Sequence, residues 1–130
     1  MMKITLLVLL IFLSLLLLCS GNLEREVVIT NYLGPGIVLR IRCQSGDDNL
    51  GLHDLMFMDS FSWKFKTNSL TTLFFCTMWW EDVSGSFEVY NALRDEKRCI
   101  THCWWNILQL AAFTYNEFNG AWDIGYEWQK

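Results

Sequence analysis

The sequence lacks most of the features that mark nucleic-acid-binding, helical and multi-span membrane proteins. Its 130 residues include one proline, two histidines and no run of basic residues, and the formal net charge is −4. Because nucleic-acid binding needs a positively charged face, we exclude nucleic acid as a partner. Beyond the N-terminal segment no stretch shows a long 3.6-residue apolar period, so no helix is needed in the rest of the chain.

Catalytic motifs are also absent. No Gly-x-Ser-x-Gly, His-Glu-x-x-His or phosphate-loop pattern occurs. His53 stands beside Asp54, but adjacent residues of a strand point to opposite faces, so the two do not form an acid–base pair. The carboxylates lie in polar loops, where they are expected to be solvated. We therefore expect a protein that is not an enzyme and that binds no cofactor.

One long apolar run stands at the N-terminus. Residues 4–18 are apolar except for two hydroxyl side chains, and small residues end the segment at Gly21. This pattern predicts a secretory signal peptide over residues 1–21 and a mature, secreted, extracellular domain over residues 22–130. An uncleaved anchor is the alternative, but the run is shorter than the roughly 20 residues of a membrane span. We therefore expect no membrane-spanning segment after cleavage.

Period-two alternation of apolar and polar side chains dominates the remaining chain. It is clear at residues 37–43, 60–66 and 121–128, whereas residues 71–80 are apolar on both faces and indicate a central, buried strand. Polar turns separate these segments at intervals of about 8 to 12 residues. The fold class that this spacing predicts is all-β, a small antiparallel β-sandwich.

Four cysteines remain once Cys19 has left with the signal peptide. An even number in a short secreted chain indicates two disulfides. If residues 99–103 are extended, the Cα atoms at the two ends of this segment lie about 13 Å apart. A disulfide needs about 7 Å or less. The cysteines concerned are Cys43, Cys76, Cys99 and Cys103.

Direct pairing of Cys99 with Cys103 would need a tight turn, and the Ile-Thr-His between them has no glycine, proline or asparagine. We therefore expect each to pair with a distant cysteine, as Cys43–Cys99 with Cys76–Cys103 or as Cys43–Cys103 with Cys76–Cys99. We favour the second arrangement, because two cysteines on core strands can be bridged inside a sandwich.

A metal site is the competing interpretation of the same segment, because Cys99, His102 and Cys103 lie close in sequence. Structural zinc sites usually need a second, similarly spaced pair of ligands. Cys43 and Cys76 are too far apart in the chain to supply it, and free thiolates would oxidise in a secreted protein. We expect no metal, and we expect His102 to be a surface residue.

Three polar connections are the candidate recognition loops, since rigid sandwiches present solvated loops at their ends. They span residues 45–49, 81–86 and 93–97. The candidate contact residues are Asp47, Asp48, Asn49, Glu81, Asp82, Arg94, Asp95, Glu96 and Lys97. The tryptophans at 79–80 and 104–105 are in surplus, and we expect most aromatic side chains to pack between the sheets.

Several long segments carry a family resemblance that runs from Val27 to Trp128. They are "RCQSGDDNLGLHDL" at 42–55, "FSWKFKTNSLTTLFFCTMWW" at 61–80, "FEVYNALRDEKRC" at 87–99 and "CWWNI" at 103–107. In this order they resemble the plant self-incompatibility protein S1 family, or S-protein homologues. The "QLAAFTY" that follows departs from the family's usual glycine and aromatic.

The resemblance implies a small secreted β-sandwich with two disulfides and no known enzyme activity. In the best understood members it implies a pistil-secreted ligand that meets a receptor on pollen. For this chain we expect a secreted ligand in cell–cell signalling or recognition, with a plasma-membrane receptor as its partner. The alternatives are a carbohydrate or cell-wall binding module that uses exposed tryptophans, and a membrane-active defence protein. The receptor, the tissue and the oligomeric state do not follow from the sequence.

Overall fold

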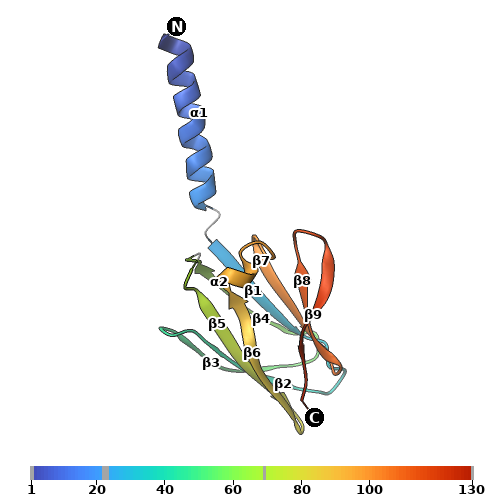
Figure 1. Ribbon diagram of the computed structural model, residues 1–130. Helices are drawn as coiled ribbons and strands as arrows, with labels where there is room; N and C mark the ends of the chain where they lie inside the picture. The colour runs from blue at the N-terminus through green and yellow to red at the C-terminus, as the bar shows by residue number, and fades with distance from the viewer. Residues whose placement is uncertain (1, 22–23, 69, 130) are drawn as a thin grey trace.

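Two β-sheets lie face to face and enclose the core, while helix α1 projects away from them (Figure 1). The computed structural model describes residues 2–21, 24–68 and 70–129. Residues 22 and 130, the expected limits of the mature chain, lie outside the described residues. Among the residues described, no helix combines the length and the apolar character needed to cross a membrane.

Within the described ranges the chain forms nine strands and two helices. The helices are α1 (Met2–Gly21) and α2 (Ala92–Asp95). The strands are β1 (Glu24–Asn31), β2 (Leu39–Gln44), β3 (Asn49–Leu55), β4 (Ser60–Lys66), β5 (Leu73–Trp80), β6 (Val83–Asn91), β7 (His102–Ile107), β8 (Ala111–Asn116) and β9 (Ala121–Glu127).

The predicted all-β sandwich is confirmed, with one difference in strand direction. One sheet has the order β4-β1-β7-β8-β9 and the other has the order β3-β2-β5-β6. All neighbours are antiparallel except β1 and β7, which run parallel. Parallel strands cannot be joined by a hairpin. Here the strands of the other sheet lie between β1 and β7 in the sequence.

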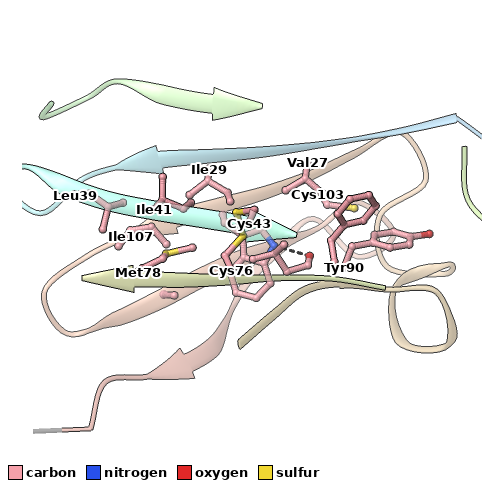
Figure 2. Close-up of a cluster of buried hydrophobic side chains, with 14 of the residues drawn as sticks. Val27, Ile29, Leu39, Ile41, Cys43, Cys76, Met78, Tyr90, Cys103 and Ile107 are labelled. Atoms are coloured by element: carbon pink, nitrogen blue, oxygen red, sulfur yellow. Dashed lines mark hydrogen bonds between the residues drawn. A yellow bond between two sulfur atoms is a disulfide. The ribbon is translucent and has the colours of Figure 1, made fainter. Parts of the chain in front are cut away.

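Every second side chain of β1, β2 and β5 lies in the core (Figure 2). Burial of such side chains stabilises a fold by about 1.5 to 3 kcal/mol for each large aliphatic group. The fully buried aliphatic members of the cluster are Val27, Ile29, Leu39, Ile41, Met78, Val89 and Ile107.

The surplus tryptophans divide between the core and the outer faces. Trp80 and Trp105 are buried between the sheets, and Trp105 Nε1 donates a hydrogen bond of 2.9 Å to the carbonyl oxygen of Val89. Trp79 and Trp104 alternate with them along β5 and β7 and face outward, half-buried. The expectation that aromatic side chains pack between the sheets therefore holds for one tryptophan of each adjacent pair.

The four cysteines form two disulfides as expected, but the favoured pairing Cys43–Cys103 with Cys76–Cys99 is wrong. The bonds join Cys43 to Cys76 and Cys99 to Cys103. Cys43 and Cys76 are directly opposite on the antiparallel strands β2 and β5, with their Cα atoms 4.0 Å apart. The other pairing considered, Cys43–Cys99 with Cys76–Cys103, is wrong for the same reason.

The error at Cys99 came from treating residues 99–103 as extended. Strand β7 begins only at His102, and the backbone N–H of Cys99 donates to the carbonyl oxygen of Asp95 at the end of α2. The chain therefore turns between the two cysteines and brings their Cα atoms to 5.1 Å. No glycine or proline is needed for this turn.

Helix α2 is a second difference, since no helix was expected after the N-terminal segment. Asn91 caps it, because its side-chain oxygen accepts a hydrogen bond of 3.0 Å from the backbone N–H of Leu93. A helix of four residues is too short to show apolar periodicity. The connection predicted as a loop at residues 93–97 is therefore helical over residues 93–95.

Strand β9 does not keep its large side chains on one face. The β8–β9 pairing shifts register and leaves Gly125 without an opposite residue. A Cβ at Gly125 would collide with a buried tryptophan ring of β7. Trp122 and Ile124 lie exposed before this bulge, whereas Tyr126 and Trp128 pack inward after it. A bulge of one residue exchanges the faces of everything beyond it.

Candidate recognition surface

The segment around the Cys99–Cys103 disulfide forms one end of the molecule, together with α2 and the β8–β9 turn. We call residues 93–102 and 116–118 the closed end, because the disulfide closes the chain there between α2 and β7. Both cysteines are fully buried. Their sulfur atoms are bonded to each other and are not available to a metal, and no three metal-ligating side chains gather anywhere in the described part of the chain.

Asp95 holds the base of the closed end. Its carboxylate is fully buried and accepts hydrogen bonds from Arg94 Nε at 2.8 Å, from Arg98 Nε at 2.9 Å and from the backbone N–H of Asn91 at 2.8 Å. The side chain of Arg98 is only 13% exposed; its Nη2 lies 2.8 Å from Asp95 Oδ1, and its Nη1 donates to the hydroxyl oxygen of Thr114 on β8. This network fastens α2 to β6 and β8.

Asp95 was a candidate contact residue, and that assignment is wrong. A fully buried carboxylate cannot touch a partner, and its charge is already neutralised by two guanidinium groups. Burial tends to lower the pKa of Arg94, but the hydrogen bonds and charge of Asp95 raise it by more, so Arg94 stays charged. Asp95 is a structural residue that positions its neighbours.

Glu117, in the β8–β9 turn, fastens this turn to the segment at the start of β7. Its carboxylate accepts hydrogen bonds from the backbone N–H groups of Thr101 and His102, at 2.9 and 2.8 Å, and from the Thr101 hydroxyl at 2.8 Å. Partial burial raises the pKa of Glu117, but these bonds to the charged form lower it by more, so the pKa lies below its usual range. The backbone N–H of Glu117 also donates to the carbonyl oxygen of Arg98.

Apolar side chains stand exposed on this fastened frame. Phe118 is 81% exposed, Leu93 is 72% exposed and Ile100 is 41% exposed. A hollow of about 590 Å³ opens between Ile100, Phe118 and the charged side chains of Arg94 and Lys97. Large apolar groups that gather on a surface, with charged groups around them, are typical of contact sites for other molecules.

The loop predicted at residues 45–49 lies at the same end of its sheet as α2. The loop follows the end of β2 and α2 follows the end of β6, and both strands end beside the start of β5. Asp47 and Asp48 are exposed, and their backbone N–H groups donate to the Ser45 hydroxyl. Asn49 already belongs to β3. Asp47 and Asp48 border a second hollow, of about 690 Å³, that also contacts the end of β4 and the start of β5.

The third predicted loop is shorter than expected and lies elsewhere. Strand β6 begins at Val83, so the turn consists of Glu81 and Asp82 alone, and both are exposed. This turn joins the far ends of β5 and β6, opposite to α2 (Figure 1). The predicted loops at 45–49 and 93–97 thus share one end of the molecule, and the turn at Glu81 does not.

Sequence reasoning missed the apolar side chains of the closed end. Phe118 stands in the polar turn "NEFNG" at residues 116–120, where it belongs to no alternating strand pattern. An isolated aromatic in such a turn was the available signal. Ile100 gave no signal, because its exposure depends on the turn that the disulfide closes. Arg94, Glu96 and Lys97 line the same hollow, and their role as contact residues stays a prediction.

His102 lies where the closed end meets the outer face of the five-stranded sheet. Its Nε2 is 3.3 Å from Glu26 Oε2, and its ring stacks on that of Trp104 with centroids 5.0 Å apart. Its side chain is 41% exposed.

Comparisons with known proteins agree with this fold. Residues 26–128 match the family described as plant self-incompatibility protein S1. S-protein homolog 3 of Arabidopsis thaliana is 40% identical over 84% of this chain and 75% of its own length. S-protein homolog 29 of the same plant is 37% identical over 78% of this chain and 76% of its own length.

A solved structure shows the same fold. It is described as that of SPH (Self-Incompatibility Protein Homologue) proteins, a widespread family of small, highly stable, secreted proteins from plants. It superposes with a TM-score of 0.64 and 22% identity, over 82% of this chain and 96% of that one. From the family match and the relatives together, the chain belongs to the plant self-incompatibility protein S1 family.

Proposed function

We propose that this protein is a secreted recognition ligand and that its closed end contacts a partner protein on a cell surface. Residues 1–21 would act as the signal peptide and would be removed. The secreted nature of the structural relative supports this route, as do disulfides that persist only in oxidising compartments. We propose no catalytic role.

The observation that carries the proposal is the exposed Phe118 on a frame that is already rigid. Binding is weakened when loops must be ordered, and a preorganised surface avoids this cost. Here the Cys99–Cys103 bond, the Asp95 network and the Glu117 bonds hold the segments that present Phe118 and Ile100. Aromatic side chains at the centre of such surfaces usually supply most of the binding energy.

The charges beside Phe118 would give the contact its specificity. Arg94, Glu96 and Lys97 line the same hollow as the apolar groups. Complementary charges across an interface mainly set the partner choice and the association rate. We therefore expect charge reversal at Lys97 to slow association, and loss of Phe118 to speed dissociation.

The test is a cell-surface binding assay with matched variants. The labelled protein is titrated onto protoplasts and intact cells from several plant tissues, as wild type, as Phe118→Ser and as Leu110→Ser. Leu110 is a good control because it is 76% exposed and lies in the β7–β8 turn at the other end of the sheet. Phe118→Ser should weaken binding at least about tenfold, a typical hot-spot effect. Equal binding by all three proteins would reject the closed end as the contact.

A further inference from the structure

A row of aromatic side chains crosses the outer face of the five-stranded sheet. The rings of Trp104 and Tyr115 have centroids 5.7 Å apart, and those of Tyr115 and Trp122 are 5.1 Å apart. His102 extends the row by stacking on Trp104. We call Trp104, Tyr115 and Trp122 the aromatic row.

Strand register explains why these rings line up. Val28 of β1 is the partner of Trp104 on β7, and Tyr115 of β8 is the partner of Trp122 on β9. Val28, Trp104 and Tyr115 each follow a buried residue along their strands, so they project from the outer face. Trp122 lies on the same face because it is the register partner of Tyr115 and its ring contacts that of Tyr115. Trp122 is 46% exposed. The row is therefore built by the sheet itself and does not depend on a loop.

The next row along the same face is uncharged and combines polar with apolar side chains. Thr30 bonds to Ser60 through their hydroxyl oxygens, 2.7 Å apart, and Asn106 is the partner of Thr30 on β7. Phe113 and Ile124 continue this second row across β8 and β9. The two rows together thus present rings, hydroxyl groups and an amide, without a charged side chain.

Charged residues of this face lie to one side of the aromatic row. Lys64 of β4, Glu26 of β1 and His102 of β7 are successive neighbours across the sheet. Glu24 and Lys66 lie one step further out and pair with each other in register. The positive and negative groups alternate, so their electrostatic fields largely cancel and this border does not attract a strongly charged ligand.

We propose that the aromatic row and the uncharged row beside it form a binding site for a neutral glycan chain. A sugar ring presents a face of C–H bonds that packs on aromatic rings, and its hydroxyl groups exchange hydrogen bonds with hydroxyl and amide side chains. The present surface supplies both kinds of group side by side. Nucleic acids and anionic membranes need clustered lysine and arginine, which these rows lack.

The dimensions favour a chain of sugars. Trp104 and Trp122 are two strands apart, which is about 10 Å at the usual strand spacing. Their rings are steeply inclined to that of Tyr115, at 61° and 53°. The row is therefore a ridged strip, and we expect it to bind a twisted or branched chain better than a flat crystalline surface. This site is independent of Phe118 and of the proposed receptor contact.

The test uses protein purified from plant cells that express the full chain, with its disulfides formed. Binding is measured by affinity electrophoresis in gels that contain xyloglucan, galactomannan or polygalacturonate, and by sedimentation with microcrystalline cellulose. The variants are Trp122→Ala and Ile124→Ala on the proposed strip. Trp79→Ala is the matched control, since Trp79 is a half-buried tryptophan on the outer face of the other sheet.

At least one neutral soluble polysaccharide should retard the wild type. Trp122→Ala should weaken the retardation at least tenfold, Ile124→Ala less, and Trp79→Ala not at all. Polygalacturonate should bind more weakly than the neutral chains. The proposal is overturned if neither neutral polysaccharide binds, if Trp79→Ala has the same effect as Trp122→Ala, or if ultracentrifugation shows that the row instead joins two copies of the protein. Because Phe118→Ser leaves this surface intact, it should bind glycan normally whether or not the receptor contact exists.

Discussion

Removing the carboxylate of Asp95 should destabilise the fold severely, although sequence reasoning placed this residue on the surface. In Asp95→Ala, the guanidinium group of Arg98 loses its carboxylate partner in a site where its side chain is only 13% exposed. Breaking a buried ion pair by deleting one partner costs about 3 to 5 kcal/mol. A whole domain is stable by only about 5 to 15 kcal/mol. The variant should thus lose a large share of its total stability.

The matched control is Arg94→Ala. Arg94 bonds to the same carboxylate, but its side chain is 43% exposed, so water compensates for much of the lost interaction. Partly exposed pairs are usually worth about 1 kcal/mol or less. Asp95→Ala and Arg94→Ala each remove one partner from the same ion-pair network. Their free energies of unfolding should differ by at least about 2 kcal/mol, because only Asp95→Ala leaves a buried charge without its partner.

Urea unfolding followed by tryptophan fluorescence measures this difference directly. The free energies of unfolding come from linear extrapolation, and the slopes should agree between variants if the folded states are equally compact. In thermal scans Asp95→Ala should melt roughly 12 to 20 °C below the wild type, given about 4 °C per kcal/mol for a domain near 100 residues. A loss below about 1 kcal/mol, or one equal to that of Arg94→Ala, would refute the reasoning that Asp95 is a buried structural anchor.

Two further predictions concern stability. Replacing Cys43 and Cys76 together by alanine should lower the free energy of unfolding by about 3.7 kcal/mol, and replacing Cys99 and Cys103 together should lower it by about 1.9 kcal/mol. The first loss is larger because closing a loop of 33 residues removes more entropy from the unfolded chain than closing a loop of 4. Denaturant unfolding that showed the larger loss for the Cys99–Cys103 bond would contradict this. The pKa of Glu117 is lowered in the folded state, so the unfolded chain binds more protons at pH values between the folded pKa and the ordinary glutamate pKa. The stabilisation is therefore present at neutral pH and is lost as the pH falls through the folded pKa. The stability difference between wild type and Glu117→Gln should therefore shrink from pH 7 to pH 3, and a constant difference would contradict the role of its charge.

The sandwich could be predicted because its determinants are local. The alternation in β2 and β4 gives each side chain a face without any knowledge of the partner strand. The outward position of Trp104 and the inward position of Trp105 follow from the same rule. In a regular strand, the face of one side chain fixes the faces of all the others.

The disulfide pairing could not be predicted, because it depends on how strands far apart in sequence are aligned. Cys43 is opposite Cys76 only in one register of β2 on β5. Cys99 reaches Cys103 only because α2 ends beside it. Similarly, the exposure of Trp122 depends on a bulge that is set by a tryptophan ring packed on Gly125. In each case the deciding contact lies in another element.

The burial of Asp95 has the same origin. In sequence it is one of five consecutive charged residues at 94–98, and nothing local separates it from Glu96. The two differ because the cap at Asn91 turns the chain so that Asp95 faces Arg98 and the interior. In the sequence, a charged residue that will be buried cannot be distinguished from an exposed one until the path of the turn that contains it is known.

The most direct test of the proposed recognition surface is the ratio of the cell-surface affinities of Phe118→Ser and Leu110→Ser. Each variant replaces one exposed apolar side chain by serine, and the two positions lie at opposite ends of the molecule. If the closed end is the contact, Phe118→Ser binds at least about tenfold more weakly than the wild type and Leu110→Ser binds like it. If the two variants bind alike, or if Leu110→Ser is the weaker, the closed end is not the recognition surface.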